Sequence, residues 1–409
     1  LEYIYDHSAD VGFPSLIMDT RNTEMHLLSY QLDFKNLSDN IIDWDSKVYY
    51  NYISHLMDDF DRSNEEIENR AIMPGMHMPM FGTTQTIGLV SKGKLLMGNN
   101  VLNLSAEIYN MKAFADMKME LLDTHQKMYL INLGDIQTYS GGLSAAYITQ
   151  VNEATLLKLN GRIDYTTRRV TNDFAKAITE SYWGNNYSTQ SIAFNTSMDL
   201  NYQLMDSQSL DFALSRVERV PTHLESFAFY IYNISDNSIY IGNPNLSKEK
   251  SYSINLGYNY SKDGVKLHFN LYNNYLVDYI AGLPNNEIEV NDNFAQSFKV
   301  YENIGNANVV GFETSLDYSI NNNFGFLAKL KYQYSRSFKF NESLPFTPPL
   351  SGMINLSYNN EDYIGVVSAE FANSQNNISK HITLEDDTPG YVILRWRNNY
   401  KISEPFTIR

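Results

Sequence analysis

The sequence contains no cysteine, so disulfides, thiolate nucleophiles and cysteine metal ligands are excluded within these 409 residues. It also has no run approaching the 18 apolar residues that a membrane-spanning helix requires. Positive charge is scarce, because 31 Lys and Arg stand against 47 Asp and Glu, for a formal charge of -16. Since attraction to phosphates needs the opposite sign, we expect no nucleic-acid partner. No charged-then-apolar leader opens the chain, which indicates a processed terminus or a start within a longer protein.

What the sequence does have is tyrosine and period-two alternation. In FGFLAKLKYQYS (324–335), Leu330 and Tyr332 fall on one face and Lys329 and Lys331 on the other, and KLHFNLYN (266–273) alternates in the same way. This pattern is typical of a strand with one apolar and one polar face. Stretches with helical periodicity are nearly absent. About sixteen such segments are predicted, near 24–37, 41–58, 81–93, 98–112, 134–152, 154–170, 188–204, 207–219, 250–262, 264–282, 304–320, 323–338, 350–360, 361–375, 388–402 and 405 to the end.

The connections between these segments alternate in length. Tight turns are predicted at 37–40, 91–94, 261–264 and 320–323, and long polar loops near 59–80, 113–133, 171–187, 220–249 and 283–303. Long strands with short turns at one end and long loops at the other are typical of an all-β, transmembrane antiparallel β-barrel surrounded by outer-membrane lipid. A secreted β-solenoid or adhesin would show a fixed repeat period, which the sequence lacks. On this reading the apolar side chains that face lipid include Leu267, Phe269, Leu271, Phe326 and Leu330.

Methionine is concentrated near the start of the sequence. Twelve of the 15 methionines precede residue 129, and the densest group is MPGMHMPM, which contains Met73, Met76, His77, Met78 and Met80. A single methionine most often fills a gap in a core. This group, however, ends a proline-bounded loop, where no regular element is expected to bury it. Thioether sulfur and imidazole are ligands that suit copper, so we interpret the segment as a copper-capturing one.

A second pair of such ligands precedes the methionine-rich segment. Strand alternation through 43–57 puts His55 and Met57 on the same face as Asp43, Asp45 and Lys47. A polar face of this kind is the lumen face of a barrel, so both side chains are expected to point inward near the outer mouth and to share one ion. The alternative for His55 is a lumen histidine held by an ordinary hydrogen bond.

Three stretches in the second half of the sequence carry a resemblance to a known family. RVERVPTHLESF (216–227), YIGNPNLSKEK (240–250) and YENIGNANVVGFE (301–313) resemble the C-terminal barrel half of TonB-dependent outer-membrane receptors. The residues that match its motifs are Arg219, Pro221, Glu225, Gly242, Asn243, Pro244, Leu246, Glu249, Asn303, Ala307, Gly311 and Glu313. The resemblance implies a plugged 22-stranded barrel that a TonB-type complex energises through the plug. Residues 1–409 would then be a partial barrel, with the plug, the first strands and the last strand outside this chain.

The first part of the sequence narrows the resemblance. HSADVGFPSLIMDTRNTE (7–24), YYNYISHLMDDFDR (49–62) and the methionine-rich segment are similar to the copper-receptor branch of that family. This similarity implies that His55 and Met57 are barrel-wall ligands and that further ligands lie on the plug. Asp59 departs from the pattern, in which asparagine is expected. The acidic run from Asp58 to Glu68 is either a solvated loop or a means of raising the local cation concentration.

The expected function is therefore transport. No nucleophile, base and orienting group can be assembled, so we expect no enzyme and no organic cofactor. We expect a Gram-negative outer-membrane transporter whose cargo is the copper ion. The alternatives are a barrel for a siderophore, a peptide or another small ligand, and a binding or structural module of the outer membrane. Whether a surface lipoprotein partners it stays open.

Overall fold

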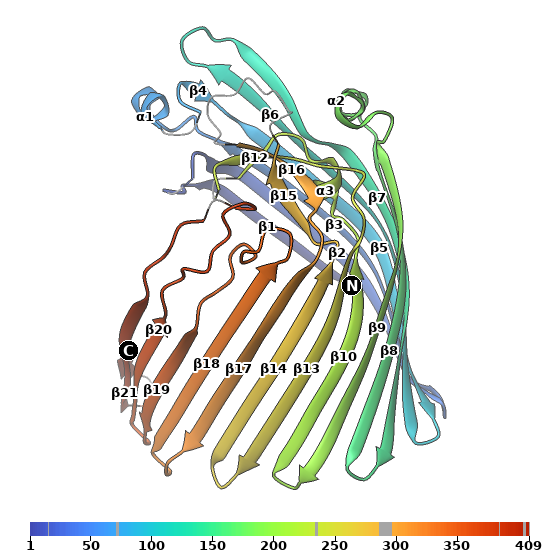
Figure 1. Cartoon of the computed structure of the whole chain (residues 1–409), viewed down its shortest axis with the longest axis vertical. Helices are drawn as coiled ribbons and strands as arrows, with labels where there is room; N and C mark the ends of the chain where they lie inside the picture. Colours follow the sequence, from blue (N-terminus) through green and yellow to red (C-terminus); the bar gives the residue numbers. More distant parts are fainter. Residues whose placement is uncertain are drawn as a thin grey trace.

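The computed structural model describes residues 1–14, 16–70, 73–233, 236–285, 297–383, 385–403 and 406–408. Long slanted strands form one antiparallel sheet that curves around a central space, with short turns at one end and the larger loops at the other (Figure 1). In order across the sheet, its long strands are β1 (Glu2–Val11), β2 (Asp19–Ser38), β3 (Ile41–Asp58), β5 (Met80–Met97), β6 (Asn100–Leu121), β7 (Lys127–Asn152), β8 (Thr155–Val170), β9 (Ser188–Met205), β10 (Gln208–Arg219), β13 (Glu249–Lys262), β14 (Val265–Val277), β17 (Ala307–Ser319), β18 (Phe324–Ser337), β19 (Ser351–Asn359), β20 (Tyr363–Ala372) and β21 (Tyr391–Ser403), followed by the short β22 (Phe406–Ile408).

The remaining elements belong to the larger loops. They are β4 (Met76–His77), which pairs with β6, the helices α1 (Asn64–Asn69), α2 (Asp173–Trp183) and α3 (His223–Phe227), and a four-stranded sheet of β11 (Ile231–Asn233), β12 (Ser238–Ile241), β16 (Ser297–Asn303) and β15 (Ile280–Pro284). Capping boxes begin α1 at Ser63 and α3 at Thr222. None of the helices in the described part of the chain is long and apolar enough to cross a membrane.

The all-β architecture predicted from the alternation is confirmed, with corrections to its details. The sequence reading missed β1, and it placed a turn at 91–94 where β5 continues to Met97. Gly93 lies there because a Cβ would come within 2.6 Å of the Trp44 ring, so the glycine serves packing and not a turn. The loop predicted at 113–133 is a hairpin, because β6 and β7 run on past the wall (Figure 1). Part of the predicted 283–303 loop, residues 286–296, lies outside the described residues.

The strand register separates two faces of the wall. Leu271 pairs with Leu256 on one side and Phe312 on the other, whereas its neighbour Tyr272 pairs with Asn255 and Gly311. The five side chains predicted to face lipid share the first, apolar face, and Lys266, Asn270, Glu313, Lys329 and Lys331 share the other. At Gly311 a Cβ would lie 2.5 Å from the Tyr272 hydroxyl, so glycine is needed there for a contact within the wall.

The buried apolar clusters lie mainly among the loops and strand ends at the outer end of the sheet. One joins β7, β8 and α2 to Phe227 of α3, and a second packs β15 and β17 against the loops that carry Leu344 and Ile382. The third is made largely of methionine. Because each cluster fixes a loop to the strands beneath it, together they determine which side chains meet at the outer mouth.

Candidate metal centre at the outer end of the barrel

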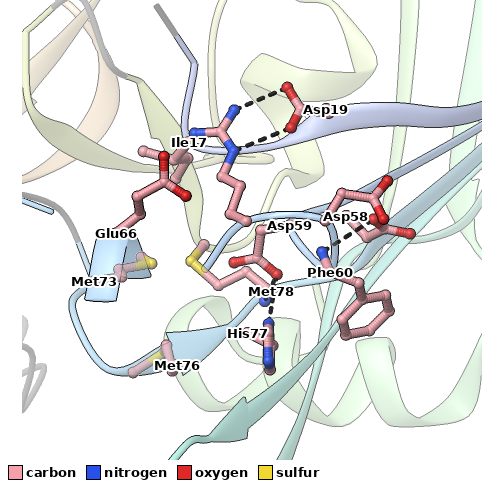
Figure 2. A network of polar contacts seen from close by, with 12 residues as sticks. Ile17, Asp19, Asp58, Asp59, Phe60, Glu66, Met73, Met76, His77 and Met78 are labelled. Atoms are coloured by element: carbon pink, nitrogen blue, oxygen red, sulfur yellow. Dashed lines mark hydrogen bonds and ion pairs between the residues drawn. The ribbon is translucent and has the colours of Figure 1, made fainter. Parts of the chain in front are cut away.

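The methionine-rich segment folds into a closely packed cluster. Met73, Met76 and Met78 are 1%, 5% and 1% exposed and pack with Met18 and Met117. Met57, Met80 and Met119 lie against the edge of this group, together with Ile17, Leu121, Leu130 and Tyr230. The thioethers of Met73 and Met78 point toward one another (Figure 2). The cluster therefore gathers soft, neutral sulfur atoms from β3, β4, β5, β6 and the loops that carry Met18, Met73 and Met78.

A buried ion pair organises the segment from within. Asp59 is fully buried and lies 2.8 Å from the Arg70 guanidinium, which is itself 10% exposed. Arg70 also donates hydrogen bonds to the carbonyl oxygens of Met73 and Met76. Asp59 accepts a hydrogen bond from the backbone N–H of Met78, at 3.4 Å. Together the two side chains tie down the backbone that carries the methionines, because each polar group bonds a different point of the loop.

The two histidines predicted as ligands occupy different surroundings. His55 lies on β3 with its Nδ1 2.5 Å from the Thr23 hydroxyl, which is the hydrogen-bonded lumen arrangement. His77 has its Nδ1 3.0 Å from Asp59, and its ring packs against Phe60 with centroids 5.0 Å apart (Figure 2). A carboxylate on one ring nitrogen fixes the tautomer and leaves the other nitrogen available to a ligand.

The structure thus brings together five of the seven predicted site residues. Met57, Met73, Met76, Met78 and Met80 meet in one cluster, whereas the two histidines point to their own polar partners. The expectation that no regular element buries the methionine-rich segment is wrong, because β4 pairs with β6 and places Met117 against it.

The reading of the acidic run as a solvated loop is wrong for its first two residues. Asp58 is 4% exposed and bonds Arg21, and Asp59 is fully buried. Asp19, farther along the rim, is paired with Arg62, and the Arg62 hydrogen bond holds the pKa of that carboxyl below its usual range. Asp58 and Asp59 are therefore internal partners of arginines, whereas Asp61, Glu65, Glu66 and Glu68 of the same run are exposed.

Sequence reasoning missed Arg70, Met18 and Met117. Arg70 lies three residues before Met73, so a lone cation close to a run of neutral side chains was the signal that could have pointed to a structural partner. Nothing comparable marks Met18 or Met117, because one belongs to a loop before β2 and the other to a β6 extension read as a loop. Within the described ranges, no three His, Asp or Glu side chains gather as a group that could hold a metal. The ligands that this site offers to a metal are therefore mainly the soft thioether sulfur atoms of the methionines.

The residues of the family motifs at the outer rim form ion pairs and hydrogen bonds that hold the 220–249 loop in place. Arg219 bonds Glu225 at 2.8 Å and Glu249 at 3.0 Å, so residues from both ends of the loop share one guanidinium. Asn303 donates hydrogen bonds to the carbonyl oxygens of Ser247 and Asp278. These motif residues hold the loop to the strands and do not line the methionine cluster.

Comparison with known proteins assigns the class. The family model for the TonB dependent receptor-like β-barrel matches residues 3–409, so the chain belongs to this family of outer-membrane barrels. No curated protein sequence matches the chain.

Solved structures of other barrels share the fold. The copper transporter OprC superposes with a TM-score of 0.80 at 18% identity, over 95% of this chain and 58% of OprC. The siderophore receptor PiuA from Acinetobacter baumannii gives 0.62 at 13% identity, over 94% of this chain and 59% of PiuA. The FrpB iron transporter from Neisseria meningitidis gives 0.64 at 13% identity, over 98% and 62%. The chain thus spans about three fifths of each, and at these identities the likeness concerns the fold.

Proposed function

We propose that this barrel is part of a TonB-dependent transporter that imports copper ions, with His55 and Met57 as wall ligands and the methionine cluster as the capture site above them. The observation that carries the proposal is the convergence of Met57, Met73, Met76, Met78 and Met80 with Met18 and Met117 at the outer end. Scattered gap-filling methionines would not gather from four separate segments around mutually facing thioethers.

The chemistry of this set favours a soft cation. Thioether sulfur is neutral and polarizable and binds Cu(I) well, whereas calcium and magnesium require oxygen ligands. The acids nearest the cluster, Asp58 and Asp59, are already bonded to arginines, which further disfavours a hard ion. The copper transporter OprC shares the barrel shape, which is compatible with this cargo and does not by itself assign it.

The site assignment is tested by metal analysis of the intact purified protein under limiting copper. The double variant His55→Ala, Met57→Ala should lose stoichiometric copper while the barrel stays folded, because both side chains lie on the polar face of β3. The matched control is Met205→Leu, since Met205 is 65% exposed at the opposite end of the sheet. Full copper occupancy in the double variant would show that the assignment is wrong.

A second pair of variants separates capture from final binding. Met76→Leu with Met78→Leu keeps the apolar volume of the cluster and removes two sulfur atoms. We expect slower uptake of copper at low concentration with a smaller change in the affinity of the loaded protein. If copper uptake is unaffected while a ferric siderophore or a peptide competes for entry, the barrel serves one of those other cargoes.

A further inference from the structure

A second polar cluster lies beneath α3, on the inner face of the wall. Arg168 of β8 pairs in register with Thr138 of β7, close to the outer ends of both strands. Its side chain shares the polar face with Thr166 and Asp164, whereas the exposed Tyr165 belongs to the apolar face. Arg168 therefore points into the barrel, next to the apolar cluster that includes Phe227 of α3.

The Arg168 guanidinium has a donor without a partner. Its Nε is buried and has no hydrogen-bond partner among the residues that the structure describes. The same holds for the hydroxyl of Thr138, which is 1% exposed. The buried Nε of Arg168 and the buried hydroxyl of Thr138 belong to paired residues of neighbouring strands, and both are costly to leave without a partner, so a missing acceptor is indicated.

A second basic group, His223, lies near Arg168. His223, the first residue of α3, is close enough to Arg168 that burial first, and then the Arg168 charge, lower the pKa of its imidazole. The nearby acid Glu225 is engaged elsewhere, because its carboxylate accepts hydrogen bonds from Arg219 and from the backbone N–H of Thr222. Two basic side chains thus lie near each other, and among the described residues the one carboxylate whose charge acts on Arg168, that of Glu225, is already bonded to these other donors.

We propose that Arg168, His223 and Thr138 form an anion site that binds a carboxylate. The guanidinium supplies a two-pronged donor that matches the two carboxylate oxygens, while the hydroxyl and imidazole supply further donors. Such a carboxylate comes from one of two sources: a dissolved organic acid that accompanies the cargo, or an acidic side chain of a polypeptide segment that fills the lumen. Both sources satisfy the same donors, and experiment separates them.

The test uses the intact protein in detergent with sodium malonate as the probe and sodium chloride at equal ionic strength as the reference. Binding is followed by calorimetric titration, and the order of α3 by hydrogen exchange of residues 222–228. The variant is Arg168→Met, which keeps most of the side-chain length. The matched control is Arg169→Met, because Arg169 is the next residue, lies on the opposite face and, among the described residues, bonds Gln137 alone.

Two outcomes support the site. Malonate binds and Arg168→Met weakens it about 10- to 100-fold, as expected for loss of charged hydrogen bonds, which identifies a dissolved source. Alternatively, malonate does not bind and Arg168→Met deprotects α3 about tenfold or more while Arg169→Met does not, which identifies a polypeptide carboxylate. Malonate binding that survives Arg168→Met, or no binding with α3 unchanged or better protected in that variant, would overturn the proposal. Neither readout involves copper, so failure here leaves the proposed transport untouched.

Discussion

Replacing Asp59 with alanine should open the methionine-rich loop without unfolding the barrel. The carboxylate is fully buried and accepts bonds from Arg70 at 2.8 Å, His77 at 3.0 Å and the Met78 N–H at 3.4 Å. Its removal leaves Arg70, only 10% exposed, as an uncompensated buried charge. Breaking such a pair on one side typically costs about 3–5 kcal/mol. The wall keeps its own ladder of hydrogen bonds, so this cost falls on the local stability of the loop.

Hydrogen exchange measures that local stability directly. The reporters are the Gly75 N–H, bonded to the Ile67 carbonyl, and the Leu122 N–H, bonded to the Gly75 carbonyl. A loss of about 3–5 kcal/mol corresponds to roughly 150- to 5,000-fold faster exchange by local opening. The control is Asp61→Ala, because that carboxylate is 73% exposed and its pairing with Arg21 contributes little. Unchanged protection in Asp59→Ala would refute the assignment of the buried pair as the organiser of the loop.

Three further outcomes follow from the structure. Burial opposes ionisation of Glu342, but hydrogen bonds from the 379–382 segment overcome that effect and lower the pKa of its carboxyl to about 2. The stability that Glu342 gives to the two loops it joins should therefore be fully present above about pH 4.5 and lost as the pH falls through about 2. Hydrogen exchange measured against pH in wild type and Glu342→Gln checks this, and an equal pH dependence in the variant would contradict it. Gly311→Ala should destabilise the barrel by about 1–3 kcal/mol because its Cβ meets the Tyr272 ring, whereas Gly161→Ala, with open space around it, should not; denaturant midpoints of the two variants decide the matter. A spin label at Leu271 should be quenched by lipid-soluble reagents and one at Tyr272 by water-soluble reagents, and the reverse pattern would show that the register is inverted.

The candidate site was predictable where it depends on local alternation. His55 and Met57 lie on the polar face because side chains in a strand alternate, and no long-range contact is needed to infer it. The limits of that reasoning appear at the loop above. Burial of Met73 and Met78 depends on Met18 from one loop and Met117 from an extended strand, and such contacts depend on register and loop closure.

The sequence by itself determined the barrel, its two faces, its two unlike ends and the soft chemistry of its outer mouth, since each follows from residue type and spacing within one segment. Only the tertiary structure decided that Asp59 bonds Arg70 and that the methionines are packed together instead of spread along a loop. It alone also brought His223, the first residue of α3, near enough to Arg168 for the guanidinium charge to act on its imidazole. The physical reason is that burial and charge pairing join side chains from distant segments, and their energies depend on which neighbours the completed fold provides.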